Sequence, residues 1–330
     1  MAYDKKIMSA ARRALERDRA ARADELEARR RDVYARVPRI RAIDRELSST
    51  AAAVLGAALR SGGDPGDAIT QLRERNLALQ EERARLLEKL GLPADYLTDK
   101  PMCAKCGDTG YQGSVTCECV KERYTRLLKE QLSMVLPIRD QNFDTFQLNY
   151  YPTKVDSRLG DSPREIMADN LYECREYAEK FTPHAINLLF YGSTGLGKTF
   201  LSTCIAEVVS ARGFSVAYDT AINIIATYET IKFGNGDGAA AAERAARYER
   251  ADLLIIDDMG TEMGTAFTVS ALYNLINTRL MAKRPMIVNT NLLPEQFSDK
   301  YSPAVASRLR GDFKPLHFVG DDIRLLKKRM

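Results

Sequence analysis

One stretch decides the fold of this chain: Gly192-Ser193-Thr194-Gly195-Leu196-Gly197-Lys198-Thr199. It matches the pattern G-x-x-x-x-G-K-[ST] at every fixed position, and it directly follows an apolar run at 186–191. Glycines allow successive backbone N–H groups to turn toward phosphate oxygens, and the next helix begins there with the positive end of its dipole. Lys198 would place a charge at the β- and γ-phosphates, and the hydroxyl of Thr199 would ligate Mg²⁺. The stretch, together with Phe200 behind it, therefore predicts a nucleotide-binding site.

The composition is that of an ordinary globular protein. The 330 residues are 45% hydrophobic and 28% charged, and the net charge of +4 permits nucleic-acid contacts without requiring them. The N-terminal segment is charged throughout, and no apolar run approaches the length of a membrane span, so we expect a cytoplasmic protein without a membrane partner. The only histidines are His184 and His317, which disfavours a histidine-based triad or metal site.

The part of the chain from 136 to 330 alternates strand and helix signals around the glycine-rich stretch. Strands are expected at 186–191, 215–218, 253–257, 286–290 and 316–319, and helices near 198–212, 220–233 and 267–283. Such alternation predicts an α/β domain with a parallel sheet and helices on both faces. The glycine-rich segment 234–238 and the alanine run behind it are expected to form a flexible excursion from this core.

A second candidate phosphate-site motif is the apolar run 253–256, which ends in Asp257 and Asp258. A buried strand here would deliver Asp257 to the C-terminal edge of the sheet, beside the glycine-rich loop. There Asp257 can hold Mg²⁺ through water, and Asp258 can polarise the attacking water. Aspartate reaches less far than the glutamate that many ATPases have at the second position, but its chemistry is the same.

Polar residues after the next strand complete the candidate catalytic set. Asn291 is placed to orient the lytic water, and Asn289 is the alternative if the register differs. Arg308 falls on an expected helix, where an arginine could reach the γ-phosphate bound by a neighbouring subunit. Arg310 is the alternative arginine, and a surface role without catalysis fits the pattern almost as well.

The first 92 residues predict a helical arm. Leu26, Val33, Ile40, Leu47 and Val54 recur every seven residues and would form one stripe on a helix. Pro38 predicts a kink near Val37, and the segment 61–66 predicts a break before a second helix. An antiparallel helical hairpin fits both halves. Two helices bury little surface, which favours packing against a partner or another domain, although a small bundle is the open alternative.

Four cysteines define a small module within residues 93–135. They are Cys103, Cys106, Cys117 and Cys119, with three glycines between the pairs that allow a tight turn or short hairpin. Four thiolates at this spacing suit a tetrahedral structural Zn²⁺ with no open ligand position. An iron–sulfur cluster and reduced, unligated thiols remain alternatives at this point. The other cysteines, Cys174 and Cys204, fall in helical segments and are expected to be buried.

The segment from about 140 to 330 resembles the AAA+ ATPases of the DnaC/DnaI helicase-loader and IstB group. The matching stretches are the entry segment 143–146, LLFYGSTGLGKTFL, LLIIDDMGTE, Thr290-Asn291, Ser307-Arg308-Leu309 and Asp322-Ile323-Arg324. The resemblance implies a sensor-1 role for Asn291, a trans-acting arginine finger in Arg308 and a sensor-2-like role for Arg324. Met259 replaces the leucine of the common Asp-Asp-Leu-Gly sequence, which is a volume-conserving change.

The same resemblance implies a function. It indicates an ATP- and Mg²⁺-dependent ATPase that self-associates through its ATPase domain and places a hexameric replicative helicase on single-stranded DNA, with the helical arm and zinc module as partner grip. One alternative is a transposition helper of the IstB kind, which loads a transposase on duplex DNA. A second is a nucleotide-gated adaptor without meaningful turnover, although the intact Asp257-Asp258 pair argues against it.

Overall fold

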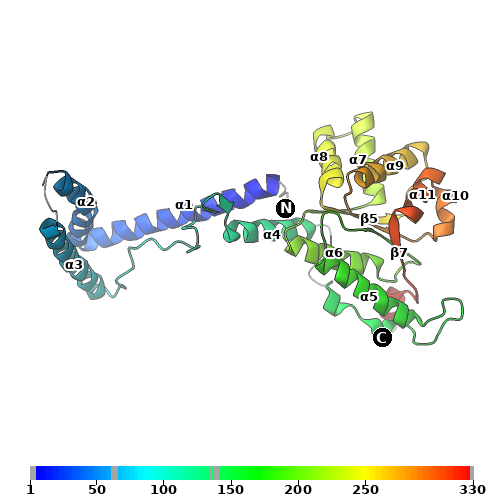
Figure 1. Cartoon of the computed structure of the whole chain (residues 1–330), viewed down its shortest axis with the longest axis horizontal. Coiled ribbons are helices and arrows are strands. Elements are labelled where there is room, and N and C mark those ends of the chain that lie inside the picture. Colours follow the sequence, from blue (N-terminus) through cyan, green and yellow to red (C-terminus); the bar gives the residue numbers. More distant parts are fainter. Residues whose placement is uncertain (1–4, 61–65, 134–135, 137–140, 328–330) are drawn as a thin grey trace. The chain divides into compact units, whose positions relative to one another are not determined.

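The computed structural model describes residues 5–60, 66–133, 136 and 141–327, and it divides into two compact units (Figure 1). One unit consists of Arg12–Val120, and the other consists of Met1–Ala11 together with Lys121–Met330. The boundaries at 92/93 and 135/136 that we expect from the sequence stay predictions.

The larger unit is built on a five-stranded parallel sheet. Its strands are β3 (Asn187–Tyr191), β4 (Val216–Thr220), β5 (Leu253–Met259), β6 (Met286–Thr290) and β7 (Phe313–His317). Their order across the sheet is β4-β5-β6-β3-β7, and every neighbouring pair is parallel. The predicted fold class is therefore confirmed. The last strand, which the sequence predicts at 316–319, begins three residues earlier, at Phe313.

Helices cover both faces of this sheet because its strands are apolar on both sides (Figure 1). In β3, Leu188 and Phe190 pack into one core with α5 (Pro163–Glu179) and α6 (Lys198–Ala211). Leu189, which points the other way, packs with residues of α7 (Ala221–Phe233), α8 (Gly238–Arg250), α9 (Ala266–Met281) and α11 (Pro303–Gly311). Cys174 of α5 and Cys204 of α6 are buried in the first core, as the sequence predicts.

The alanine run after 234–238 is a regular helix, so the predicted flexible excursion is wrong. Helix α7 ends at Phe233, and the next residue, Gly234, has a φ of +70°, a left-handed conformation that commonly stops a helix. Three residues later the carboxylate of Asp237 caps α8 by accepting from the N–H groups of Ala239 and Ala240. Ala241 and Ala245, one turn apart, are buried. Alanine is the best helix former, and here its small side chain also allows close packing.

Shorter elements surround the edge of the sheet where the strands end. They are the 3₁₀ turns η1 (Phe143–Thr145), η2 (Leu148–Tyr150) and η3 (Pro294–Gln296), and the short helices α10 (Phe297–Lys300) and α12 (Ile323–Lys327). The helix α4 (Glu118–Ser133) begins at the end of the smaller unit and continues into the larger one.

The smaller unit contains the predicted helical hairpin. After α1 (Lys5–Arg36), the chain breaks at Val37, as Pro38 predicts, and α2 (Pro38–Arg60) follows. Helices α2 and α3 (Gly66–Lys89) lie side by side (Figure 1). Arg39, at the start of α2, pairs with Glu82, toward the end of α3, so the two helices are antiparallel. The predicted break at 61–66 lies almost wholly outside the described residues.

A small apolar core holds this hairpin together. Val33 and Ile40 of the predicted stripe are buried with Leu87 and Leu97, whereas the side chain of Val54 lies outside the described residues.

A two-stranded hairpin, β1 (Tyr111–Gln112) and β2 (Val115–Thr116), lies between the two cysteine pairs, which confirms the predicted short hairpin.

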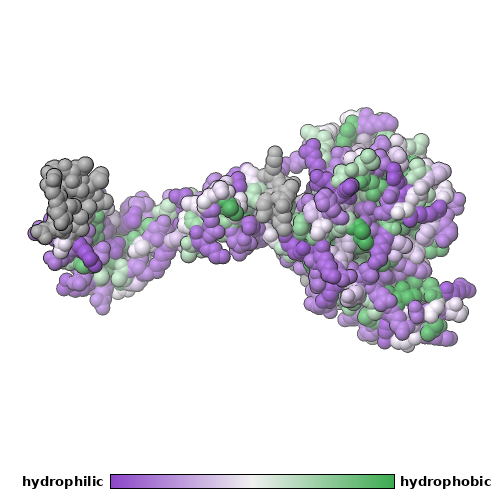
Figure 2. All heavy atoms as spheres, viewed as in Figure 1, coloured by the Kyte–Doolittle hydropathy of each residue, from purple (hydrophilic) through white to green (hydrophobic). Residues whose placement is uncertain are grey.

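The surface is consistent with this layered packing. The coloured residues visible in Figure 2 are mostly hydrophilic. Among the helices of the described residues, none has the length and apolar character needed to cross a membrane.

Candidate nucleotide site and cysteine cluster

The glycine-rich loop joins the end of β3 to the start of α6, as the motif predicts. Its three glycines, Gly192, Gly195 and Gly197, have φ values of +136°, +76° and +93°, which side-chain-bearing residues rarely adopt. Space adds a second reason. A Cβ on Gly192 would lie 2.1 Å from the carbonyl oxygen of Phe318, and one on Gly195 would lie 1.9 Å from an oxygen of Asp322.

Lys198 is held inside this loop. Its Nζ donates to the carbonyl oxygens of Gly192 and Ser193, both at 2.7 Å, and to Asn291 Oδ1 at 2.8 Å. Burial lowers the pKa of Lys198 to about 8, and the carboxylates of Asp257 and Asp258 oppose part of that shift. A cation that is held this way, and partly dehydrated, is ready to exchange its partners for phosphate oxygens.

Thr199 and Asp257 come together as the sequence predicts. Thr199 Oγ1 donates to Asp257 Oδ2 at 3.0 Å, and the Asp257 side chain is almost fully buried. The same carboxylate accepts from Asn289 Nδ2, from the backbone N–H of Asp258 and from the phenol of Tyr218. A hydroxyl oxygen and a carboxylate side by side are the donor set that Mg²⁺ prefers, so these residues fit a magnesium ion.

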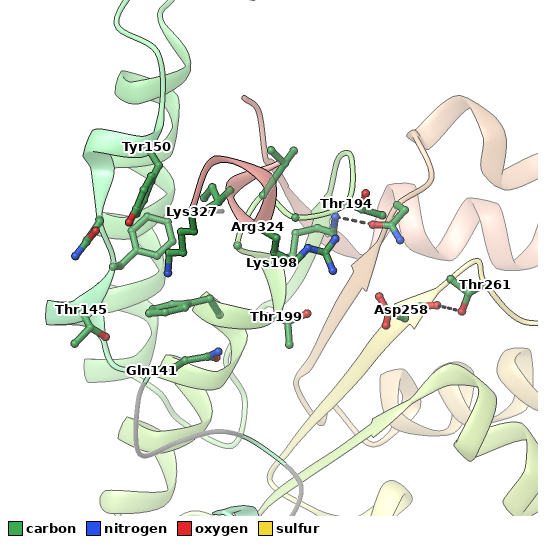
Figure 3. Close-up of a pocket in the computed structure, with 18 residues that line it drawn as sticks. Gln141, Thr145, Tyr150, Thr194, Lys198, Thr199, Asp258, Thr261, Arg324 and Lys327 are labelled. Atoms are coloured by element: carbon green, nitrogen blue, oxygen red, sulfur yellow. Dashed lines mark hydrogen bonds between the residues drawn. The ribbon is translucent and has the colours of Figure 1, made fainter. Parts of the chain in front are cut away.

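Asp258 has an unusual backbone. Its φ is +52°, and the pairing of β5 with β6 shifts register between Ile256 and Met259. The irregularity turns the Asp258 side chain out of the sheet and into the cavity, where Figure 3 shows it opposite Tyr150 and Lys327. Partial burial, together with the negative charge of Asp257, raises its pKa.

The two candidate asparagines have different places. Asn291 lines the cavity and accepts the hydrogen bond from Lys198. Asn289 is fully buried and donates to Asp257 Oδ1 at 2.8 Å and to Ser202 Oγ at 2.9 Å. Asn291 is therefore the one that faces the cavity, and Asn289 supports the carboxylate behind it.

A cavity of about 530 Å³ opens over the loop (Figure 3). The predicted site residues that line it are Thr194, Gly195, Leu196, Gly197, Lys198, Thr199, Phe200, Asp258, Asn291 and Arg324. Gly192 and Ser193 lie beneath it and contribute the carbonyl oxygens that hold Lys198. Arg324 comes from α12, whose Ile323 N–H donates to the carbonyl oxygen of Gly195.

One wall of the cavity was not predicted as part of the site. It is formed by the segment 141–150, with Phe146 and Tyr150 as its aromatic residues. Phe146 packs edge-on against Phe200, with the two ring centres 5.4 Å apart. Lys327 Nζ lies over the ring of Tyr150, 5.4 Å from the ring centre (Figure 3). An apolar, aromatic wall suits a flat base. The cluster of aromatic residues at 143–151 is the signal that could have pointed to it.

Arg308 and Arg310 are not among the residues that line this cavity. Arg308 on α11 contacts Asp312 at 3.3 Å and Asn277 Oδ1 at 3.2 Å. Arg310 donates to the carbonyl oxygen of Pro294. Neither arginine is placed at the nucleotide site of its own chain.

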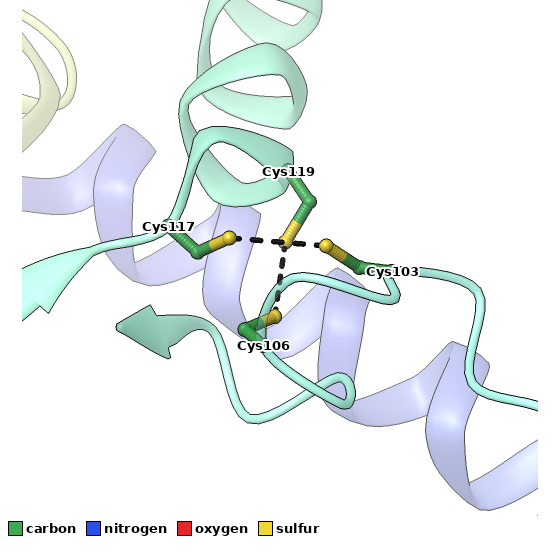
Figure 4. A group of neighbouring side chains, drawn as sticks. All are labelled: Cys103, Cys106, Cys117 and Cys119. Atoms are coloured by element: carbon green, nitrogen blue, oxygen red, sulfur yellow. Dashed lines mark hydrogen bonds between the residues drawn. The ribbon is translucent and has the colours of Figure 1, made fainter. Parts of the chain in front are cut away.

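The four predicted cysteines converge in the smaller unit (Figure 4). Their sulfur atoms all lie within 4.8 Å of one another. Cys103 and Cys117 Sγ are 3.8 Å apart, and Cys106 and Cys119 Sγ are 3.6 Å apart. A tetrahedron of thiolates around zinc has edges of about 3.8 Å. The geometry therefore fits a zinc module with four cysteine ligands.

Buried Asp108 organises the loop that presents these thiols. Its carboxylate accepts from the backbone N–H groups of Met102 and Cys103 and pairs with Arg22 of α1. Burial opposes ionisation of Cys106, but a backbone hydrogen bond from Gly110 and the neighbouring thiols lower its pKa to about 7. In the same cluster, burial and the neighbouring thiols raise the pKa of Cys119, so the thiols do not ionise equally.

The parallel sheet, the glycine-rich loop with its lysine, and the facing Asp257 define a P-loop nucleotide-binding domain. Residues 168–328 match the family model described as IstB-like ATP binding protein. This match covers just under half of the chain, so that part of the chain is similar to the IstB-like ATP-binding family.

Individual relatives each match less than half of the chain. The replicative helicase loader DnaC of Escherichia coli (strain K12) is 26% identical over 140 residues, which is 42% of this chain and 56% of that protein. An ATP-binding protein in an insertion sequence of Mycobacterium tuberculosis is 26% identical over 124 residues, 37% of this chain and 48% of that protein. The chain thus spans about half the length of these curated relatives.

Two solved structures match part of the chain. A crystal structure of the DnaC helicase loader has a TM-score of 0.46 at 18% identity and covers 56% of this chain and 99% of that chain. A crystal structure of DnaI has a TM-score of 0.43 at 18% identity and covers 56% of this chain and 92% of that chain.

Proposed function

We propose that this protein is an ATP-dependent loader that places a hexameric replicative helicase on single-stranded DNA. The observation that carries the proposal is the pairing of an assembled nucleotide site with a separate compact unit that has its own helices and cysteine cluster. A loader needs one part that responds to nucleotide and another that holds its partner. The sequence relation to DnaC over 140 residues supports this interpretation.

The geometry of the larger unit supports a chemical role for each residue of the site. Lys198 would bind the β- and γ-phosphates, and Thr199 with Asp257 would hold Mg²⁺, which neutralises developing phosphate charge when bound. Asp258 would polarise the attacking water, and Asn291 would orient it. Arg324 would contact the phosphates from α12. Arg308 would be supplied by a neighbouring subunit, since it does not line the site of its own chain.

The smaller unit would bind the partner protein. The hairpin of α2 and α3, together with the zinc-bound four-cysteine module, would grip the helicase, while the ATPase unit would contact single-stranded DNA and associate with further copies. Such a protein would work in the cytoplasm, where the replicative helicase is found.

The test is a loading assay with the full-length protein. The replicative helicase of the source organism is mixed with this protein and with circular single-stranded DNA coated with binding protein, and DNA unwinding is measured. We expect unwinding only with the protein and ATP. We expect Lys198→Ala to abolish nucleotide binding and loading while helicase binding in gel filtration survives. Absence of a complex between helicase and wild-type protein would refute the proposal.

A second candidate is a transposition helper ATPase. The match to the IstB-like family model and the relative in an insertion sequence favour it. The two functions predict different partners: the helper would bind a transposase and duplex DNA, and the loader a helicase and single strands. Identification of the protein that co-purifies with the chain from its source cell, followed by binding to single- and double-stranded DNA, separates them.

A nucleotide-gated adaptor is the third possibility, and Asp258 decides it. The Asp258→Asn variant keeps the size of the side chain but removes its negative charge. If the protein turns ATP over, this variant should bind nucleotide normally and lose most hydrolysis, with and without single-stranded DNA. Equal phosphate release by the wild type and the variant would favour the adaptor.

A further inference from the structure

Tyr218 makes the shortest hydrogen bond to the carboxylate of the magnesium site. It lies on β4, the edge strand that pairs with β5. Its phenol donates to Asp257 Oδ2 at 2.6 Å. The other donors to this carboxylate are at 2.8 Å or more.

The donors are shared unequally between the two oxygens of Asp257, and Thr199 Oγ1 reaches both, at 3.3 Å from Oδ1 and 3.0 Å from Oδ2. Oδ1 accepts from Asn289 and from the backbone N–H of Asp258. Oδ2 accepts from Thr199 Oγ1 and from Tyr218. If the Thr199 hydroxyl oxygen turns to a magnesium ion, its hydrogen bond to Oδ2 is lost. Of these donors, Tyr218 is then the one that keeps Oδ2 in place.

The strand behind Tyr218 is fixed by its next residue. Asp219 Oδ2 accepts from the phenol of Tyr248 on α8 at 2.7 Å, and Asp219 Oδ1 accepts from Asn223 Nδ2 on α7 at 2.8 Å. Tyr218 and Asp219 therefore bond to groups on different elements, with β4 between them. A donor on a strand held in this way is preorganised for its acceptor.

We propose that Tyr218 is a positioning residue for Mg²⁺ binding, and that its phenol orients the Asp257 carboxylate toward the ion. The inference rests on the proposed function, because it requires that nucleotide binds with magnesium. Residues that orient a ligand from behind typically contribute a factor of about ten to one hundred in metal affinity.

The test compares Tyr218→Phe with wild type and with Tyr228→Phe in the full-length protein. Each variant keeps its aromatic ring and loses one hydroxyl. Tyr228 is a matched control because it is also half-buried and its phenol bonds to Glu249, outside the cavity. Binding of a fluorescent ATP analogue is measured while MgCl₂ is titrated and again in EDTA, and thermal unfolding is recorded for all three proteins.

We expect Tyr218→Phe to need about tenfold more magnesium for half-maximal binding. Its affinity in EDTA and its unfolding temperature should match wild type, and Tyr228→Phe should match wild type throughout. An unchanged magnesium midpoint overturns the inference, and so does equal weakening with and without magnesium, which would indicate a general structural role. A wild-type chain that binds nucleotide in EDTA as tightly as in magnesium would refute the magnesium part of the proposed function and this inference with it. A chain that binds no nucleotide would refute the proposed function itself.

Discussion

At the scale of single residues, Lys198 combines a buried position with three hydrogen bonds from its ammonium group. Two of these bonds go to backbone oxygens that belong to the loop itself, so the loop supports the cation that would bind the phosphates. The cost of burial appears as a lowered pKa, to about 8. The charge of Lys198 is thus sensitive to pH in a range where most lysines stay protonated.

This sensitivity gives a prediction for nucleotide affinity. Phosphate groups favour the protonated form of Lys198, so nucleotide binding raises the pKa of this side chain. Nucleotide affinity is therefore at its full value when the pH is below the pKa that Lys198 has in the ligand-free protein. Affinity should fall as pH rises above about 8, by at most about tenfold per pH unit. Equilibrium binding of a fluorescent ATP analogue across this range measures it. Lys198→Arg is the control, because arginine stays charged throughout. A wild-type affinity that is flat across the range would contradict the prediction.

Part of this site could be predicted from the sequence and part could not, for physical reasons. Lys198, Thr199 and Asp257 are predictable because their motifs encode a strand, a turn and a strand end, and parallel strands end at one edge. Tyr218 was missed because its contact depends on the register between β4 and β5. The left-handed backbone of Asp258 was also missed, because glycine, the usual sign of such a conformation, is absent there.

At the scale of elements, α8 shows how a glycine- and alanine-rich segment can be ordered. The sequence 234–245 looks flexible by composition, yet Gly234 ends one helix and Asp237 begins the next. Local propensity could have indicated the helix, since alanine is its best former, but the packing of α8 on α7 is a tertiary property. Composition alone did not distinguish the two outcomes.

The cap of α8 can be tested directly. Asp237→Ala removes the acceptor for two N–H groups and should cost about 1 kcal/mol of local helix stability. Hydrogen exchange of α8 amides measures it, and we expect about fivefold faster exchange in the first turn. Asp237→Ser retains a capping oxygen and should stay close to wild type. Exchange in Asp237→Ala as slow as in wild type would show that packing on α7 alone holds the helix.

The cysteine cluster is a second element whose four thiols the sequence located, while the supporting Asp108 was visible only in the structure. We expect the wild-type protein to carry about one zinc ion per chain. Cys117→Ser should lose this ion, because a serine hydroxyl does not replace a thiolate ligand. Metal analysis of purified protein measures this. Cys204→Ala is the control, since this buried thiol lies outside the cluster and should leave zinc bound. Equal zinc content in Cys117→Ser would contradict the assignment, and iron in the wild type would indicate a cluster instead.

At the scale of the whole molecule, the nucleotide site and the arginines of α11 belong to one chain but not to one cavity. An ATPase whose arginine acts in trans needs at least two copies. The proposed function therefore makes activity depend on protein concentration, with assembly and hydrolysis coupled through Arg308.

Mixing two inactive variants tests this arrangement. Arg308→Ala keeps its nucleotide site but lacks the arginine, and Lys198→Ala keeps the arginine but lacks the site. Each alone should hydrolyse little ATP, because loss of such an arginine typically costs about a thousandfold or more. Their mixture should regain activity through interfaces that combine the intact halves. No recovery, in a mixture shown by light scattering to form oligomers, would exclude Arg308, and the same experiment with Arg310→Ala would test the alternative.

The end of β6 has a consequence for how this protein can change over generations. Asn289 supports Asp257 from one side and Asn291 holds Lys198 from the other, while Thr290 between them donates to the carbonyl oxygen of Met259. Asn289 lies within β6 and Asn291 directly follows its last residue, so insertion or deletion of a single codon between them would move Asn291 relative to Lys198 while Asn289 stays against Asp257. The phosphate-binding lysine would lose one partner, although the support of the Asp257 carboxylate would remain. Homologous genes that keep ATP dependence should therefore show a fixed length here, even where surrounding loops vary.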